Sequence, residues 1–276
     1  MNRIASRFAL CREQGRAALM THVTAGDPDS DTSLAILGAL VKGGADLIEL
    51  GIPFSDPAAD GPAIQQSSVR ALASGQTVDR TLAQAKMFRA QFPTIPLVLM
   101  GYYNSIYDYG AAAFIETAAN AGVDGLIVAD LPFEMSHELD HLIDRTAIKL
   151  IRLVAPNTED ERLKAIAGAA RGFIYNLAAT GVTGRARPQL DTVALSVKRI
   201  RRATDLPIIT GFGVRTPEQA AAIGKICDGV VVGSLFSEAI EVAHERQLLT
   251  SLPTTVEALA SGIRAAIQIR PLCTEW

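Results

Sequence analysis

Short apolar segments rich in Val, Ile and Leu recur along the chain, and this recurrence constrains the fold more than any other feature. Each has the length and the β-branched content of a buried strand. They occupy residues 18–25, 46–50, 96–100, 125–129, 149–155, 172–177, 206–210 and 229–233. Between them lie stretches with helical apolar spacing, such as 30–44, 77–92 and 159–170, several of which begin at Ser, Thr or Asp. The sequence therefore predicts strands and helices in alternation.

This alternation predicts an α/β protein with a single (β/α)8 TIM barrel spanning residues 1–276 as one domain. The eight units follow one another without a Pro/Gly/Ser-rich linker or a change of composition between the halves. An open doubly wound sheet fits this pattern less well. Ile4, Phe8 and Cys11 have helical spacing before the first strand segment. We expect them to lie on an extra N-terminal helix that covers the bottom of the barrel.

Composition excludes several classes of protein. The formal net charge is -3, the signs are interspersed and aromatic residues make up 5% of the chain, so nucleic acid is not an expected partner. No apolar run is long enough to span a membrane, and the N-terminus lacks the apolar core of a signal peptide. Cys11, Cys227 and Cys273 have no zinc or disulfide spacing, which suits a reducing compartment. We expect a cytoplasmic protein.

Carboxylates occur where the second strand segment ends. In a barrel, chemistry collects at this end of the strands. Glu49 alternates with its neighbours so that it shares a face with Leu47, and burial there would disfavour its charged form, as suits a general acid/base. A structural carboxylate is the alternative for an isolated Glu. Asp60 favours the catalytic interpretation because its loop can fold over the same opening, whereas Asp56, before a proline, is typical of a turn.

Glycines follow three neighbouring strand segments near the end of the chain. They lie in the stretches 179–188, 210–213 and 230–234, the last of which leads into a short predicted helix at Ser234. Glycine lets the backbone approach an anion closely, and the amides of a helix N-terminus add donors. This pattern predicts a phosphate site. Glycine also ends strands for steric reasons, so one such motif alone would be weak.

The sequence HELDH at residues 137–141 has the spacing of a zinc-protease motif. On a helix, Leu139, Leu142 and Ile143 form the apolar face, which leaves His137 and His141 on the solvated side. We therefore expect no metal site.

Lysine and histidine placement narrows the chemistry further. A Schiff-base enzyme needs a lysine at the catalytic end of a strand, but Lys149 begins the fifth strand segment. His22, in the first, suits either a pocket or the core. The residues together predict a metal-free acid/base enzyme that acts on a small phosphorylated molecule.

The segment GGADLIELGIPFSDPAADGPAIQQSS (43–68) resembles the signature of the tryptophan synthase alpha subunit family. Further similar segments occur in order along nearly the whole chain: AGDP (25–28), GYYN (101–104), ADLPFE (129–134), LVAPNT (153–158), GVTG (181–184), GFGVRTPEQA (211–220) and DGVVVGS (228–234). The resemblance implies a carbon–carbon lyase of tryptophan biosynthesis. It would cleave indole-3-glycerol phosphate to indole and glyceraldehyde 3-phosphate by a retro-aldol reaction, without a cofactor of its own.

The resemblance also implies roles for individual residues. Glu49 would be the acid/base, and Asp60 would stabilise the positive charge that develops on the indole ring. The phosphate would bind at Gly184, Phe212, Gly213, Gly233 and Ser234. The indole pocket would comprise His22, Ile64, Met100, Tyr102, Ile127, Ala129, Tyr175, Leu177, Thr183 and Phe212. Position 22 is usually apolar in the family, so His22 is a departure that could place a polar edge beside the indole.

A partner is implied as well. The family's alpha subunit binds a pyridoxal-phosphate-dependent beta subunit, with which an α2β2 heterotetramer is expected, and passes indole to it through a tunnel. Pro53, Asp56 and Pro57 would face this partner, and the loops 53–62 and 179–188 would close over the substrate. Two alternatives remain open: a stand-alone lyase that releases indole, and a non-enzymatic phosphate sensor, which would require the loss of Glu49 or Asp60.

Overall fold

The structure is a computed structural model that describes residues 2–177, 189–211, 213–242 and 245–266 of the 276-residue chain. Within these residues the strands form one parallel sheet, in which β1 pairs with both β2 and β9. The strands are β1 (Ala18–Thr24), β2 (Leu47–Gly51), β3 (Leu97–Gly101), β4 (Gly125–Val128), β5 (Lys149–Leu150), β6 (Arg152–Val154), β7 (Ile174–Leu177), β8 (Ile208–Gly211) and β9 (Gly229–Val232).

The order of the strands closes the sheet into the predicted barrel. It runs β5-β4-β3-β2-β1-β9-β8-β7-β6, and the two outermost strands, β5 and β6, are consecutive in the chain. Only Ile151 separates them, so they are two halves of the predicted fifth strand. β5 pairs with β4 and β6 pairs with β7. The (β/α)8 prediction is confirmed, with the fifth strand interrupted where its pairing changes from one neighbour to the other.

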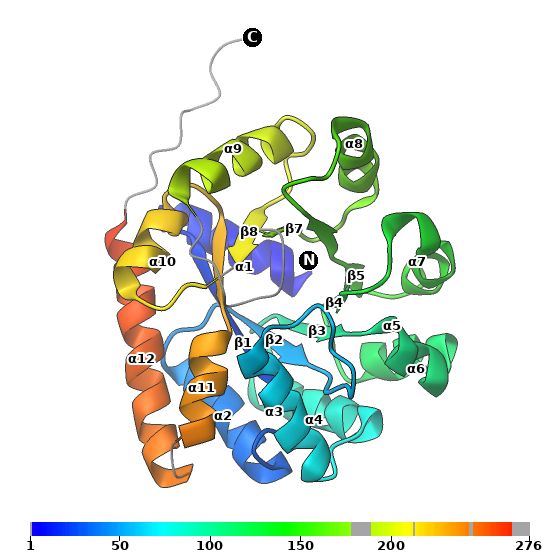
Figure 1. The fold of residues 1–276 in the computed structure, drawn as a ribbon, viewed down its shortest axis with the longest axis vertical. Coiled ribbons are helices and arrows are strands. Elements are labelled where there is room, and N and C mark those ends of the chain that lie inside the picture. Colours follow the sequence, from blue (N-terminus) through cyan, green and yellow to red (C-terminus); the bar gives the residue numbers. More distant parts are fainter. Residues whose placement is uncertain (1, 178–188, 212, 243–244, 267–276) are drawn as a thin grey trace.

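Helices surround the strands (Figure 1). They are α1 (Arg3–Glu13), α2 (Ser30–Lys42), α3 (Pro62–Ala73), α4 (Val78–Gln91), α5 (Tyr103–Tyr109), α6 (Ala111–Asn120), α7 (His137–Ile143), α8 (Asp160–Ala169), α9 (Leu190–Arg201), α10 (Pro217–Gly224), α11 (Ser234–Val242) and α12 (Glu245–Ala265), with a 3-10 turn at Phe133–Met135. Side chains cap several of them, as expected: Asp29 accepts hydrogen bonds from Asp31 N and Thr32 N at the start of α2, and Thr77 accepts one from Arg80 N at α4.

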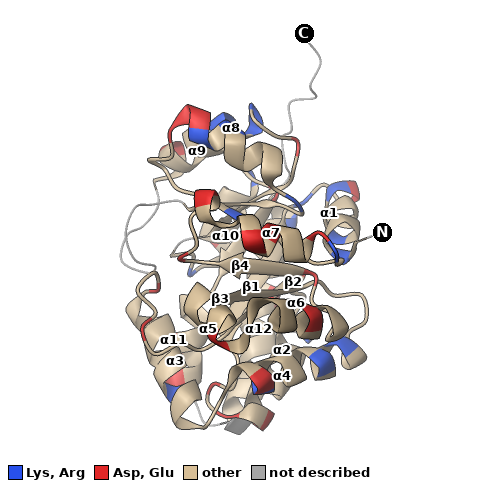
Figure 2. Ribbon diagram, turned by 90° about the vertical axis from the view of Figure 1, so that its right-hand side faces the viewer, with Lys and Arg blue, Asp and Glu red and all other residues tan. Residues whose placement is uncertain are grey.

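Two apolar layers hold the fold together. The larger lies between the strands and the outer helices and includes Ile48 and Leu50 of β2. The smaller fills the inside of the barrel, where Leu47 packs with side chains of the other strands and with Ile4 and Phe8 of α1. The prediction that these two residues cover the bottom of the barrel is confirmed. In Figure 2, α1 lies at the right-hand side of the molecule.

Charged residues lie mainly on the outer helices and loops. On the side drawn in Figure 2, acidic and basic residues are interspersed. Among the residues that the structure describes, no helix combines the length and the apolar character needed to cross a membrane.

Three buried aspartates close the bottom of the barrel in the same way. Asp46, Asp124 and Asp228 each lie at the start of a strand. Each accepts a hydrogen bond from a backbone N–H in the first two residues of a neighbouring strand, donated by Leu19, Leu97 and Ile208 respectively, at 2.9 to 3.0 Å. Each also pairs with arginine: Arg16 with Asp46, Arg3 and Arg89 with Asp124, and Arg201 with Asp228. A buried carboxylate that is paired in this way fixes where each strand begins.

We predict that Asp124→Ala lowers the free energy of unfolding by about 3 kcal/mol, because the Leu97 N–H and two arginines lose a buried partner. Urea denaturation followed by circular dichroism measures this change. Asp205→Ala, which removes an exposed aspartate from a loop, is the matched control and should remain within about 0.5 kcal/mol of the parent. Equal stabilities of the two variants would contradict a structural role for Asp124.

Candidate active site

Glu49 lies in the middle of β2 and points into the barrel. Strand alternation places it on the same face as Leu47, as the sequence predicts, and its side chain is buried with the residue 1% exposed. One oxygen, Oε1, is within hydrogen-bond distance of His22, whereas Oε2 is buried with no hydrogen-bond partner. A carboxylate with one held oxygen and one free oxygen is equipped to exchange a proton with a ligand.

His22 is the neighbour that holds Glu49. The parallel register of β1 and β2 sets the two residues opposite each other, and His22 Nδ1 lies 2.8 Å from Glu49 Oε1. The imidazole fits between two glycines. A Cβ on Gly51 would lie 3.1 Å from His22 Cε1, and one on Gly233 would lie 3.2 Å from His22 Cβ. The glycines at the ends of the neighbouring strands therefore give the ring its space.

Asp60 reaches the same interior from the loop between β2 and α3. Its residue is 5% exposed, and Tyr102 donates a hydrogen bond to Oδ2 at 2.9 Å. The Tyr102 hydroxyl in turn accepts a hydrogen bond from Ala59 N at 3.0 Å. This chain of contacts orients the carboxylate and leaves its Oδ1 buried without a partner.

One cavity joins these groups to the glycines at the end of the chain. His22, Glu49 and Asp60 line it together with Gly213, Gly233 and Ser234, and its apolar wall comes from Ile64, Met100, Tyr175, Leu177, Val214 and Val231. His22 Nε2, Glu49 Oε2 and Asp60 Oδ1 are all buried and unpartnered at this place. Buried polar atoms without partners are costly, and such a cluster beside a cavity is a feature of sites that receive a ligand.

Burial and mutual charge change the proton affinities in the site. Burial has the largest effect on Asp60 and raises the pKa of its carboxyl, against the charge of His22 and the Tyr102 hydrogen bond. Burial alone would lower the pKa of His22. The hydrogen bond to Glu49 and the charges of Glu49 and Asp60 outweigh this effect, so the pKa of His22 is raised. Burial, followed by the carboxylate charges, raises the pKa of Tyr102 and Tyr175, which therefore keep their hydroxyl protons at neutral pH.

The predicted phosphate residues divide into two groups. Gly213, with φ of 63°, Gly233 and Ser234 line the cavity, and Ser234 begins α11, so the helix amides open onto it. Gly184 and Phe212 lie outside the described residues. Arg215 also lines the cavity, but its guanidinium pairs with Glu238 of α11.

The ion pair between Arg70 and Asp27 helps to connect helices α3 and α11, which begin on opposite sides of the cavity. Arg70 of α3 donates two hydrogen bonds to the buried Asp27 and one to the Ser237 carbonyl of α11. Ser67 of α3 also binds Asp27. Because α3 begins just after Asp60 and α11 begins at Ser234, this connection ties the carboxylate side of the cavity to the glycine side.

The predicted indole residues surround the cavity on several sides. His22, Ile64, Met100, Tyr175 and Leu177 line it, and Tyr102 lines a small adjoining cavity. Ile127 is fully buried inside the barrel beneath them. Thr183 lies outside the described residues, as does the predicted lid 179–188.

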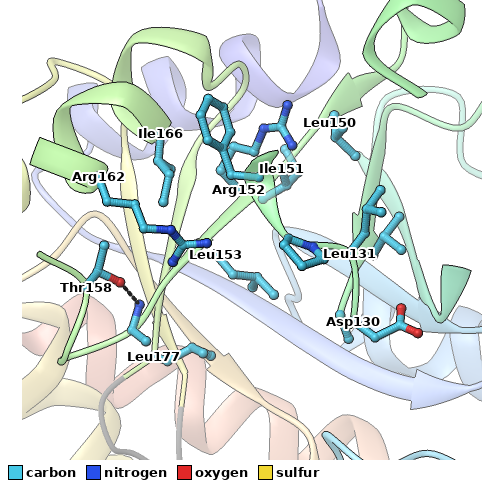
Figure 3. Close-up of a pocket in the computed structure, with 15 residues that line it drawn as sticks. Asp130, Leu131, Leu150, Ile151, Arg152, Leu153, Thr158, Arg162, Ile166 and Leu177 are labelled. Atoms are coloured by element: carbon cyan, nitrogen blue, oxygen red, sulfur yellow. Dashed lines mark hydrogen bonds between the residues drawn. The ribbon is translucent and has the colours of Figure 1, made fainter. Parts of the chain in front are cut away.

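Ala129 lines a neighbouring cavity of about 280 Å³, which Leu177 borders as well (Figure 3). This cavity is not among the sites predicted from the sequence. Leu153 forms part of its wall. The Arg152 guanidinium carbon, Cζ, lies 5.2 Å from the centre of the Phe133 ring.

The residues predicted to face a partner differ in exposure. Asp56 is exposed and forms the expected turn, in which its carbonyl accepts a hydrogen bond from Ala58 N at 2.8 Å. Pro57 is half-buried and Pro53 is buried.

The zinc-protease motif also has the predicted orientation. His137 and His141 are exposed on α7, while Leu139 and Ile143 are buried. In the described part of the chain, no group of three or more His, Cys, Asp or Glu side chains is arranged to hold a metal ion.

Two contacts in the site were missing from the sequence interpretation. The pairing of His22 with Glu49 depends on the register of two strands, which spacing along one strand does not give. Tyr102 was expected to form an apolar wall, yet its hydroxyl binds Asp60. A tyrosine directly after a strand that ends near the predicted carboxylates was the available signal.

Comparison with known proteins identifies the relatives of the chain. The family model described as tryptophan synthase alpha chain matches residues 8–264. A chain of Mycobacterium tuberculosis tryptophan synthase, solved in space group F222, has a TM-score of 0.88 and 36% identity, covering 95% of this chain and 98% of that one. Tryptophan synthase subunit alpha from Legionella pneumophila str. Paris has a TM-score of 0.89 and 33% identity, covering 96% and 99%.

Asp60 allows a stability prediction from its raised pKa. A raised folded-state pKa means that the group stabilises the fold fully below its unfolded pKa of about 3.9 and that this contribution is lost as pH rises through the folded value. Ionised Asp60 therefore costs stability at neutral pH. We expect Asp60→Asn to have a Tm at pH 7.5 at least as high as that of the parent, with the difference disappearing toward pH 4. Scanning calorimetry measures both, with Asp205→Asn as the exposed control. A lower Tm at pH 7.5 would contradict this account.

Proposed function

The chain belongs to the tryptophan synthase alpha chain family and cleaves indole-3-glycerol phosphate in tryptophan biosynthesis, and we propose that Glu49 and Asp60 perform the acid/base chemistry of this cleavage. The observation that carries the proposal is the pair of buried, unpartnered carboxylate oxygens, Glu49 Oε2 and Asp60 Oδ1, at one cavity with a glycine-lined end. The reaction yields indole and glyceraldehyde 3-phosphate.

Two proton movements are needed for the carbon–carbon bond to break. Indole C3 gains a proton, and the hydroxyl on the adjacent side-chain carbon loses one as that carbon becomes an aldehyde. The electrons of the broken bond restore the C2–C3 double bond of the ring. In this proposal the acid form of Glu49 gives its proton to C3, and the resulting carboxylate accepts the proton of the hydroxyl. The enzyme thus returns to its initial protonation state.

Asp60 serves a different step. Protonation at C3 makes the indole ring a cation whose positive charge is centred on the ring nitrogen, and Asp60 Oδ1 would accept the hydrogen bond of the ring N–H. An anion held in a buried site stabilises such a charge more than it would in water. Tyr102 supports this role because it fixes the other oxygen of Asp60.

The substrate phosphate would bind at the opposite side of the cavity. Gly213 and Gly233 let the backbone come close to the phosphate oxygens, and the N-terminus of α11 at Ser234 contributes amide donors and a favourable dipole. Binding energy from this unreactive end of the substrate would hold indole C3 near Glu49. The tie through Arg70 supports this arrangement, since it connects α3 with α11.

We predict that Glu49→Gln lowers kcat for indole release from indole-3-glycerol phosphate by about a thousandfold, because the amide neither gives nor accepts the required protons. Indole is measured by a colorimetric or fluorescence assay at substrate saturation. Glu116→Gln, an exposed position on α6, is the matched control and should keep the activity of the parent. Indole release at parental rates by Glu49→Gln would discard the assignment.

The family partners with a beta subunit. We propose that this chain does so in an α2β2 assembly that passes indole to a pyridoxal-phosphate enzyme, and that the exposed turn at Asp56 lies at the contact. The turn follows β2 directly and leads to Asp60, so a partner that contacts Asp56 would also influence the position of the catalytic carboxylate. Phe54 supports such coupling, because its ring stacks on Tyr102 at 5.2 Å.

We predict that the beta subunit raises the rate of indole-3-glycerol phosphate cleavage and that Asp56→Ala reduces this activation by about fivefold or more, while the basal rate of the isolated chain stays unchanged. Cleavage is measured at increasing beta-subunit concentrations. Asp205→Ala matches Asp56→Ala in charge and exposure and should be activated as the parent is. If the cleavage rate stays the same when the beta subunit is added, the chain is instead a stand-alone lyase.

A further inference from the structure

We propose that His22 is a positioning residue for the cleavage reaction: its Nδ1 holds Oε1 of Glu49, and this contact keeps Oε2 free to act on the substrate. The inference rests on the proposed role of Glu49 and goes beyond it, because it assigns a task to a side chain at a position where an apolar wall would be sufficient to surround indole. The contact between His22 and Glu49 is 2.8 Å long and completely inside the barrel.

The direction of the hydrogen bond follows from elementary chemistry. An ionised carboxylate only accepts hydrogen bonds, so when Glu49 is ionised the hydrogen lies on His22 Nδ1. His22 is 3% exposed, and water therefore does not compete for its contact with Glu49. The raised pKa of His22 agrees with this geometry, since the imidazole retains its proton more tightly beside Glu49 and Asp60.

The imidazole is fixed in place as a positioning group requires. The register of β1 and β2 places its Cα opposite that of Glu49. Gly51 at the end of β2 and Gly233 just after β9 leave room for this side chain, because a Cβ on either would be within 3.2 Å of a side-chain atom of His22. The strand register therefore sets the place from which the ring holds a carboxylate oxygen.

The second ring nitrogen of His22 has no hydrogen-bond partner. His22 Nε2 is buried without a partner, and His22 lines the same cavity as Glu49 and Asp60. A histidine that only filled space in the core would be expected to have both nitrogens satisfied. With Nδ1 bound to Glu49, the unpartnered Nε2 marks the ring as part of the site.

The groups around His22 decide how its loss would change the pH dependence. Glu49 faces it from β2, Asp60 from the loop before α3, and Tyr175 from β7 is close to both carboxylates. Tyr102 acts through Asp60, and Arg215 at the cavity wall is neutralised by Glu238. Both tyrosines are uncharged at neutral pH, Tyr102 donates its hydroxyl hydrogen to Asp60, and among these groups His22 is the one within hydrogen-bond distance of Glu49. A buried carboxylate that loses such a donor becomes harder to ionise.

The test compares variants that lack or retain a donor at position 22. His22→Leu and His22→Phe remove it, whereas His22→Asn places an amide N–H near the former Nδ1. We expect the two apolar variants to lower kcat about tenfold to a hundredfold, as for the loss of a hydrogen bond to a charged group. KM should change less than kcat. The high-pH limb of the kcat/KM profile, where the acid form of Glu49 is lost, should move to higher pH in both apolar variants, and His22→Asn should restore most of kcat.

Controls separate this inference from a structural role and from the proposed function. His137→Leu, at an exposed position on α7, should match the parent throughout. The Tm of each variant shows whether it is folded, and the pair of apolar variants covers the case in which one does not fold. If Glu49→Gln is inactive while His22→Leu keeps the parental kcat and pH profile, the inference fails and the proposed function stands. If His22→Asn is no better than His22→Leu, the hydrogen bond is not the cause. If Glu49→Gln itself is active, the proposed function fails first.

Discussion

The parallel pairing of β1 with β2 is the constraint on which the site depends. Their register sets His22 opposite Glu49, and the alternation of each strand turns both side chains toward the inside of the barrel. Neighbouring strands lie about 4.8 Å apart, a distance that two side chains of this length bridge with one hydrogen bond. A shift by one residue would turn Glu49 into the apolar layer between strands and helices, where Ile48 and Leu50 now pack. The pairing of the two strands therefore sets the contact between His22 and Glu49.

The two ends of the barrel treat buried carboxylates in opposite ways. At the bottom, Asp46, Asp124 and Asp228 are paired with arginine and with the backbone N–H of a neighbouring strand. At the top, Glu49 and Asp60 each keep one oxygen without a partner. The first arrangement stabilises the fold, and the second leaves hydrogen-bonding capacity for a substrate at a cost in stability. This division matches the general tendency of such barrels to separate stability from activity.

The sequence was informative wherever periodicity or local chemistry decided the outcome. It predicted the barrel, the covering helix with Ile4 and Phe8, the face that Glu49 shares with Leu47 and the turn at Asp56. It did not predict that the fifth strand is interrupted at Ile151, because the apolar run continues through the point where the pairing changes from β4 to β7. Nor did it predict the contacts of His22 and Tyr102, which arise between strands that are distant in sequence. Roles given by family resemblance are most open to revision where this chain differs from the family pattern, as at position 22.

The distance between acid/base groups and the anion end of the cavity is itself a structural property of this chain. Asp60 lies just before α3 and Ser234 begins α11, and both helices are held to the buried Asp27 region through Arg70. In the proposed binding mode the substrate would span this distance, because its indole ring and its phosphate are separated by a short chain of carbons. The connection between the two helices would then let phosphate binding align the ring with Glu49, since displacement at one end would appear at the other. Under this proposal, specificity for a substrate of this length follows from the fold as much as from the residues that touch it.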